Sequence, residues 1–396
     1  MDIQEETPRW FNRNVIALGI VSFLTDIHSE AILALLPQFM ADVLGLRKSF
    51  IGLIEGLADI TASLLKVASG WFSDRIGKRK PVVLAGYVLS TMAKPFLALA
   101  QSGWHVLAVR IADRTGKGVR TSSRDALIAE STAVSVRGRA FGFHRAMDTG
   151  GAIVGTLLAI LLLHVYSGEY RLVFLVVTIA GVAAAFSVVF GVRDTARQVT
   201  NECAAGGTAE LPGSLPLFLL AHTIFSAGNF SYAFFLLRAQ DVGVTRALVP
   251  ALYLVHNVVY AAAAYPAGVL IDRLGARTAL VLAYLTHSVA CLGFAFFGAP
   301  YLMPLWFVVY GIQLAATGAG ARSAASTLTC VTRRGLGLGT FHACEGVGLL
   351  IASLVGGVLW DTLGSGAAPF YYGAAMALVA AIVLSYALRD TCAAGS

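Results

Sequence analysis

The chain has 396 residues, of which 57% are hydrophobic and 13% are charged, and its formal net charge is +7. Soluble domains carry about 25% charged residues, so this composition excludes an ordinary soluble globular protein. Apolar stretches of about 20 residues recur along nearly the whole chain, which is typical of a polytopic helical membrane protein. The five cysteines have no CxxC spacing and predict neither a disulfide framework nor a thiolate metal site.

Twelve transmembrane helices are predicted, in two groups of six. The first group covers 15–39, 51–72, 82–101, 104–127, 139–166 and 170–192. The second group covers 214–237, 248–271, 278–298, 301–327, 335–362 and 367–388. We therefore expect an all-α membrane protein in which residues 1–192 form one six-helix bundle, residues 193–213 a polar linker, and residues 214–396 a second bundle.

The positive charges of the predicted loops gather on one side of the membrane. They precede the first helix, follow the second, flank the turn between the fourth and fifth, and recur in the linker and in the second half. They are Arg9, Arg13, Arg75, Lys78, Arg79, Lys80, Arg124, Arg137, Arg139, Arg193, Arg197, Arg273, Arg277, Arg333, Arg334 and Arg389. The positive-inside rule then places both termini and the linker in the cytoplasm. The net positive charge is explained by this orientation, so nucleic acid is not an expected partner.

The two halves of the chain repeat one another. Residues 70–80, GWFSDRIGKRK, correspond to residues 268–278, GVLIDRLGART, at an offset of 198 positions. TGKGVR at 115–120 corresponds to TGAGAR at 317–322 at an offset of 202. Such a duplication indicates two pseudo-symmetric helical bundles, and it predicts that the functional site lies where they meet.

The repeated pattern Gly-x-x-x-Asp-Arg-x-Gly resembles the signature loop of the major facilitator superfamily, and it joins the second and third helices of each half. Its members here are Gly70, Asp74, Arg75, Gly77 and Arg79 in the first copy and Asp272 and Arg273 in the second. The resemblance implies a cytoplasmic gate between the two bundles. From the residues alone, the alternative is a basic loop that only sets topology. Arg114 and Gly118 in the fourth helix also fit the superfamily.

The strings DRTGKGVRTSSRDAL and RGRAFGFHRAMDTGGA resemble a bacterial and archaeal subgroup of this superfamily. The resemblance implies a monomeric secondary transporter in the bacterial inner membrane that works by alternating access, but it names no substrate. The charges inside the predicted spans favour a small polar or anionic solute. We expect its partners to be that solute, protons and membrane lipids, with efflux favoured over import. The alternatives are an importer of an organic anion or a metal chelate, and a multidrug exporter.

Other classes of function are disfavoured by the residues themselves. The chain lacks the GxxxxGK[ST] motif, which argues against ATP-driven pumping. An enzyme would need a nucleophile and base, or a metal, at one depth in the membrane, and the ionisable residues fit a salt network better. We therefore expect neither enzymatic activity nor a cofactor, and a membrane sensor is a weaker alternative.

Ionisable residues inside the predicted spans of the first half are costly and usually face a cavity or a partner. The candidates for proton coupling are Asp26, Glu30, Asp59, Asp113 and Asp148. A carboxylate that changes its partner between two states of a transporter can carry a proton. The alternative is a buried structural network in which these acids neutralise nearby arginines and lysines.

Substrate-binding candidates come from both halves. Arg110 and Arg114 lie on the fourth helix, where a guanidinium fork suits a carboxylate or a phosphate. The second half contributes a polar and aromatic set, with the alternative that each histidine only packs: Asn229, Tyr232, His256, Asn257 and Tyr260. No metal site is expected, because i,i+2 spacing splits Asp26, His28 and Glu30 between helix faces.

Overall fold

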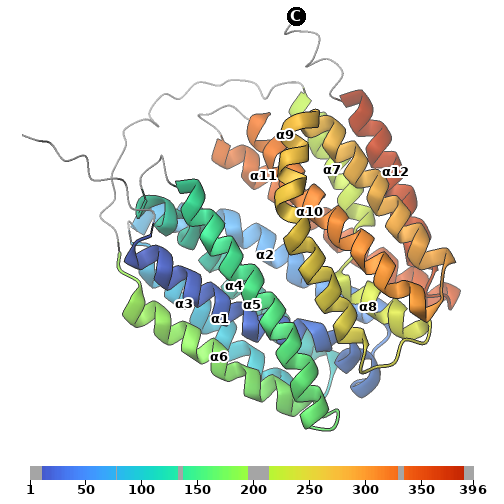
Figure 1. Ribbon diagram of the computed structural model, residues 1–396, viewed down its shortest axis with the longest axis horizontal. Helices are drawn as coiled ribbons and strands as arrows, with labels where there is room; N and C mark the ends of the chain where they lie inside the picture. The colour runs from blue at the N-terminus through green and yellow to red at the C-terminus, as the bar shows by residue number, and fades with distance from the viewer. Residues whose placement is uncertain (1–10, 77, 133–136, 195–213, 329–333, 388–396) are drawn as a thin grey trace, which may run out of the picture. The chain divides into compact units, whose positions relative to one another are not determined.

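The computed structural model describes residues 11–76, 78–132, 137–194, 214–328 and 334–387, and within these ranges the regular structure is entirely helical (Figure 1). In the first half the α-helices are α1 (Arg13–Gln38), α2 (Lys48–Ile76), α3 (Lys80–Ala93), α4 (Gly103–Glu130), α5 (Arg137–Val165) and α6 (Tyr170–Gly191). In the second half they are α7 (Ser214–Gly228), α8 (Tyr232–Asp241), α9 (Val249–Phe296), α10 (Met303–Thr327), α11 (Arg334–Leu363) and α12 (Ala368–Ala387).

Each of the twelve predicted spans is found, with boundaries within a few residues. A short π-helical turn, Phe39–Val43, extends α1, and a 3-10 segment, Lys94–Leu99, extends α3. The eighth and ninth predicted spans form the single element α9, which bends at Gly275 because this residue has a φ of 79°. Among the described residues, ten helices are long and apolar enough to cross a membrane. Helices α2 and α4 fall outside that set because they contain several charged residues.

The seventh predicted span is broken in the middle, which the sequence analysis did not anticipate. It consists of α7 and α8, separated by residues 229–231. Ser231 has an extended backbone and caps α8, because its hydroxyl accepts a hydrogen bond from the backbone N–H of Ala233 at 3.4 Å. Such a break leaves the N-terminus of α8, the positive end of a helix dipole, inside the span.

Residue contacts divide the chain into two compact units that do not follow the two halves of the sequence. Unit 1 comprises residues 1–33, 65–99 and 111–201, and unit 2 comprises residues 34–64, 100–110 and 202–396. Helices α1, α2 and α4 contribute residues to both units. The division into six-helix bundles at 1–192 and 214–396 stays a prediction, and most of the predicted linker lies outside the described residues.

Each unit has its own apolar core. In unit 1, the core joins α1, α3, α4 and α6 through Leu18, Tyr87, Leu127 and Val188. In unit 2, α7 lies alongside α11 and α12, and α9 lies alongside α10 and α12 (Figure 1). Large aromatic rings fill the unit 2 core, among them Phe218, Phe225, Tyr284 and Phe341.

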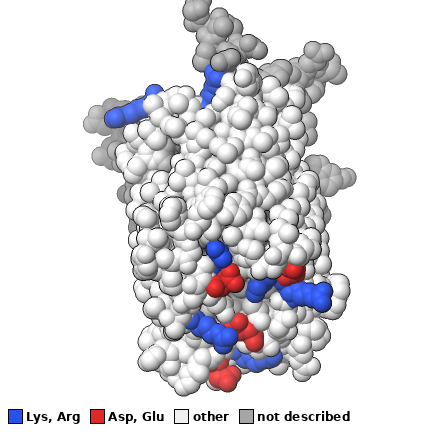
Figure 2. Space-filling model, turned by 90° about the vertical axis from the view of Figure 1, so that its right-hand side faces the viewer, with Lys and Arg blue, Asp and Glu red and all other residues white. Residues whose placement is uncertain are grey.

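One face of the molecule has the surface expected of a protein in contact with lipid. Figure 2 shows a broad area without charged side chains above a cluster of Lys, Arg, Asp and Glu residues. Large apolar side chains are exposed elsewhere as well, such as Ile179 and Phe190 on α6. A soluble monomer rarely exposes contiguous apolar surface of this extent, whereas a membrane protein presents it to the acyl chains.

Helices α2 and α11 approach closely within unit 2, and glycines permit the approach. A Cβ atom on Gly52 would overlap the carbonyl oxygen of Ser353, and one on Gly357 would lie 2.6 Å from the carbonyl oxygen of Lys48. Small residues at such contacts let two helix backbones pack directly against each other in a membrane.

We expect Gly52→Ala to destabilise the protein by about 1–3 kcal/mol, because the methyl group meets backbone that cannot move aside cheaply. The measurement is the midpoint of thermal unfolding of the purified protein in detergent. Gly268→Ala on α9 is the matched control, since a Cβ there meets nothing within 4 Å. Equal midpoints for the two variants would contradict the close approach of α2 and α11.

Candidate functional site

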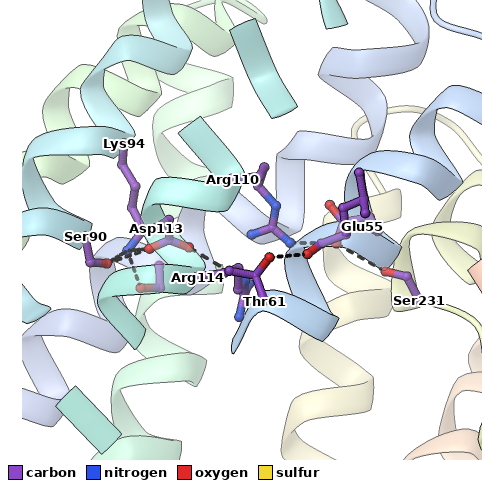
Figure 3. A network of polar contacts seen from close by, with 10 residues as sticks. Glu55, Thr61, Ser90, Lys94, Arg110, Asp113, Arg114 and Ser231 are labelled. Carbon is purple, nitrogen blue, oxygen red and sulfur yellow. Dashed lines mark hydrogen bonds and ion pairs between the residues drawn. The ribbon is translucent and has the colours of Figure 1, made fainter. Parts of the chain in front are cut away.

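A buried ionic network in unit 1 centres on Asp113 of α4 (Figure 3). The Lys94 ammonium lies 3.0 Å from Asp113 Oδ1, and the Ser90 hydroxyl donates to the same oxygen at 2.5 Å. Lys94 also donates to the Ser29 hydroxyl at 2.7 Å, and Arg114 Nε lies 3.8 Å from Asp113 Oδ2. The pairing and the hydroxyl groups offset the cost of burying both charges.

Lys94 was missed by the sequence analysis, although its position carried a usable signal. It lies inside the apolar span predicted for 82–101, where a lone lysine needs a cavity or a partner. Its partner could not be read from the sequence, because Asp113 lies on the next helix and only their packing brings the two together.

A second buried network, in unit 2, joins Arg110 to an acid that we had not selected (Figure 3). Arg110 Nη2 donates to Glu55 Oε2 of α2 at 2.6 Å, and the side chains of Arg110 and Glu55 are only 3% and 1% exposed. The Ser231 hydroxyl donates to the same carboxylate oxygen at 3.3 Å. Because Ser231 caps α8, the Glu55 carboxylate lies at the positive end of that helix. A guanidinium and a helix N-terminus therefore converge on one carboxylate.

Three of the proton-coupling candidates come together in unit 1. Asp26 of α1 interacts electrostatically with Asp148 of α5, with Glu30 and with Lys117. Asp148 accepts a hydrogen bond from the Ser22 hydroxyl at 2.7 Å. Two neighbouring carboxyl groups repel each other when both are charged and can share a hydrogen bond when one is protonated, so this pair can store a proton. Arg145 Nη1 lies 3.2 Å from the other oxygen of Asp148 and neutralises the remaining negative charge.

The aromatic candidates of the second half form a ladder within unit 2. The Tyr232 ring lies 5.2 Å from that of Tyr253, and the His256 ring stacks on that of Tyr310 at 4.6 Å. Tyr253 and Tyr260 flank His256 at 6.1 Å and 6.5 Å. The sequence analysis missed Tyr253 and Tyr310, although Tyr253 precedes His256 by three residues and shares its helix face.

The other candidates are placed as follows. Asn229 lies in the break between α7 and α8, and Asn257 is half-buried on α9. Asp59 is half-buried on α2 and belongs to unit 2, like Arg110, whereas Asp26 belongs to unit 1.

The predicted gate is only partly described. Arg79 Nη2 lies 3.0 Å from Glu130 Oε1 in unit 1. The Asp194 carboxylate caps α3 by accepting from the backbone N–H groups of Arg79 and Lys80 at 3.0 Å and 2.7 Å. The remaining members lie on α2 (Gly70, Asp74 and Arg75), on α9 (Asp272 and Arg273) and outside the described residues (Gly77). The role of this loop as a gate stays a prediction.

Unit 2 also contains a polar connection that we did not predict, at the ends that the predicted topology places outside the cytoplasm. The Asp361 carboxylate of α11 caps α2 by accepting from the backbone N–H groups of Lys48 and Ser49 at 3.1 Å and 2.8 Å. Asp42 accepts from Gln240 at 2.9 Å and forms an ion pair with Arg246 at 3.1 Å. These bonds join segments that come from the two halves of the sequence.

Solved structures with the same fold are all-helical transporters. The POT family transporter PepTSo gives a TM-score of 0.80 at 12% identity, covering 97% of this chain and 99% of PepTSo. A mutant of the nucleoside transporter NupG gives a TM-score of 0.78 at 14% identity, and the match covers 95% of this chain and 100% of the NupG chain. At such identities the likeness shows the fold alone, and it confirms the predicted all-helical fold.

Sequence similarity identifies the family. The chain is 34% identical over 388 residues to the uncharacterised MFS-type transporter MJ1317 of Methanocaldococcus jannaschii, covering 96% of each protein. A shorter stretch of 162 residues is 28% identical to the multidrug resistance protein MdtH of Aeromonas hydrophila, covering 41% of this chain and 39% of MdtH. The family model of the Major Facilitator Superfamily matches residues 18–236 and 217–393 of this chain. The chain therefore belongs to the major facilitator superfamily, and it is a membrane transporter rather than an enzyme.

Proposed function

We propose that this transporter moves a small anionic or polar solute across the bacterial inner membrane by alternating access. The observation that supports an anion is the convergence of Arg110 and the N-terminus of α8 on the Glu55 carboxylate. Both groups bind carboxylates and phosphates, so a solute anion can replace Glu55 as the partner of Arg110. The aromatic ladder around His256, in the same unit, would hold the organic part of the solute.

We propose further that transport is coupled to protons through the Asp26–Asp148 pair. The two neighbouring carboxyl groups would share one proton, and the loss of that proton would leave two carboxylates repelling each other. A change in the spacing of α1 and α5 would therefore change the affinity of the pair for a proton. That dependence of proton affinity on conformation is what coupling requires.

The proposal also covers the direction of transport, the orientation of the protein in the membrane and its oligomeric state. We propose efflux as the direction, in keeping with the partial similarity to a multidrug resistance protein, and an importer of an organic anion or a metal chelate is the alternative. The distribution of positive charge along the sequence supports an orientation with both termini in the cytoplasm. We propose that the protein works as a monomer.

The test uses purified protein in proteoliposomes that enclose a pH-sensitive dye. An imposed pH gradient is combined in turn with mono- and dicarboxylates, sugar phosphates, a citrate–iron chelate and a cationic dye. We expect at least one organic anion to move together with, or against, protons, and Arg110→Lys to abolish that flux because it removes the guanidinium fork. Movement of the solute against the proton flow would support efflux, and movement with it would support import. Transport of the cationic dye alone would overturn the anion proposal.

A further inference from the structure

Four ionisable side chains of the second half form a chain that the proposed site does not use. His222 Nδ1 of α7 lies 2.8 Å from the Tyr284 hydroxyl of α9. His222 Nε2 faces Glu345 Oε1 of α11 at 4.0 Å, and the other oxygen of Glu345 lies 3.2 Å from His342 Nδ1. The connected order is therefore Tyr284, His222, Glu345 and His342, and all four residues belong to unit 2.

The two ends of this chain differ in access to solvent. His222 is 2% exposed and Tyr284 is fully buried, whereas the side chains of Glu345 and His342 are 33% and 26% exposed. Glu345 and His342 are thus the members of the chain that solvent reaches, and a gap of 4.0 Å separates Glu345 Oε1 from the buried His222 Nε2. Since α7 and α11 both begin on the predicted cytoplasmic side, His222 and His342 each lie about 12 Å along their helices from that side.

Two kinds of group next to His222 can interact with a positive charge on its ring. The ring stacks on Phe341 at 4.7 Å and on Phe225 at 6.0 Å, and aromatic faces attract a cation. The Glu345 carboxylate supplies the opposite charge. Helix α12, which also packs against α7, has no charged residue in 368–387. Helix α2 contacts α11 near this site, where Ile60 and Ser63 lie against Gly346, and the ionisable residue next to that contact is Asp59.

The hydrogen bond between His222 Nδ1 and the Tyr284 hydroxyl can form in both protonation states, while Nε2 faces Glu345 at 4.0 Å and has no hydrogen-bond partner among the described residues. In neutral His222, the Tyr284 hydroxyl donates to Nδ1, and the proton on Nε2 points toward Glu345. After protonation, Nδ1–H donates to the Tyr284 oxygen, while Nε2–H still faces the carboxylate. Gaining a proton therefore needs only the reversal of one hydrogen bond and no movement of the backbone.

We propose that His222, Glu345 and His342, with Tyr284 as hydrogen-bond partner, form a proton-binding site in the second half of the transporter. The sequence analysis had assigned coupling mainly to the first half. The site deepens the proposed proton coupling, and it rests on that proposal for its role in transport. With the Asp26–Asp148 pair in the first half and the His222–Glu345 pair in the second, each half of the sequence would hold one proton-binding site.

The test follows histidine protonation directly, so it needs no identified solute. Protein labelled with ¹⁵N-histidine in lipid nanodiscs is titrated from about pH 8 to about pH 5 and followed by NMR, a range chosen around the ordinary histidine pKa. We expect one buried histidine to become imidazolium and its signal to be absent in His222→Asn. In Glu345→Gln, the ratio of imidazolium to imidazole at His222 should fall at least about tenfold, because an opposing charge has been removed.

Two further variants keep the result interpretable. His287→Asn removes another buried histidine, whose ring centroid lies 5.2 Å from that of Phe225 and whose Nε2 lies 3.4 Å from Cys291 Sγ. This variant should leave the His222 signal unchanged. Tyr284→Phe should lower the ratio of imidazolium to imidazole at His222 less than Glu345→Gln does. Because it removes only a hydroxyl group, it also serves as the test variant if Glu345→Gln fails to fold. A His222 that stays neutral to the lowest pH, or one indifferent to both substitutions, would overturn the proposed site.

The proteoliposome flux separates this inference from the proposed function. If a pH gradient drives solute flux but His222 does not titrate, the second proton site is wrong and the transporter proposal stands. If His222 titrates as expected but no solute moves with protons, the site stands and the proposed coupling is wrong.

Discussion

Arg110→Ala will destabilise the transporter by about 3–5 kcal/mol, because it leaves the Glu55 carboxylate in the interior without its cation. The two side chains are almost wholly buried and are joined at 2.6 Å, so water cannot solvate the carboxylate that remains. The measurement is the free energy of unfolding in mixed micelles with increasing denaturing detergent. The expected change is large enough to appear as reduced yield of folded protein.

Two control variants test this physical reason. Replacing both Arg110 and Glu55 by methionine should return the stability to within about 1–2 kcal/mol of the wild type, since an apolar pair of similar volume costs little. Arg246→Ala removes an ion pair with Asp42 in which the arginine is 68% exposed, and it should cost no more than about 1 kcal/mol. If the double variant is as unstable as Arg110→Ala, the loss comes from packing and not from the uncompensated charge.

The double methionine variant also separates stability from transport. It should fold and yet fail to move the anion identified in the flux screen, because the guanidinium that would bind the anion is absent. Normal transport by this variant would show that Arg110 is a structural residue, which is the alternative that the sequence left open.

Asp26→Asn will abolish accumulation driven by a pH gradient while leaving counterflow exchange of the solute. An asparagine at this position can still hydrogen-bond to Asp148, but it cannot give up or take up a proton. Gradient-driven flux should fall at least tenfold, corresponding to about 1.4 kcal/mol or more. The assay compares uptake under an imposed gradient with exchange under equal pH in the same vesicles.

Matched substitutions identify which carboxyl carries the proton. Asp148→Asn should give the same loss, whereas Ser22→Ala removes only a hydroxyl donor to Asp148 and should retain coupling. Asp59→Asn tests the proton-coupling candidate of α2 in the same assay. Unchanged gradient-driven uptake in both Asp26→Asn and Asp148→Asn would remove this pair as the proton carrier.

The helix count and the family were accessible from the sequence for a simple reason. The hydrocarbon layer requires about 20 apolar residues per span, so each helix leaves a local signature that needs no knowledge of its neighbours. The repeat of GWFSDRIGKRK as GVLIDRLGART supplied the duplication, which is again a comparison of short strings. The break at residues 229–231 left a weaker signature, because the turn-favouring Gly228 and Asn229 and the capping Ser231 lie inside an otherwise apolar span of ordinary length.

The site was accessible only in part. Arg110 and Asp113 stood out because charges inside an apolar span are costly wherever they occur. Lys94 and Glu55, their partners, could not be assigned, since each lies on another helix and the choice among several acids and bases depends on side-chain contacts. The candidates Tyr232 and His256 proved to belong to one aromatic ladder, but Tyr253 and Tyr310 complete it.

The sequence by itself determined that this is a duplicated twelve-helix membrane transporter, and it located the charged helices. Only the tertiary structure decided which charges meet: Asp26 with Asp148, Lys94 with Asp113, and Arg110 with Glu55 at the end of α8. Each span must be apolar because it lies in the hydrocarbon layer, whatever its neighbouring helices are. The local sequence therefore suffices to predict the spans. A buried charge is stabilised by a partner at 3 Å, and that partner is chosen by the packing of helices that are distant in the chain.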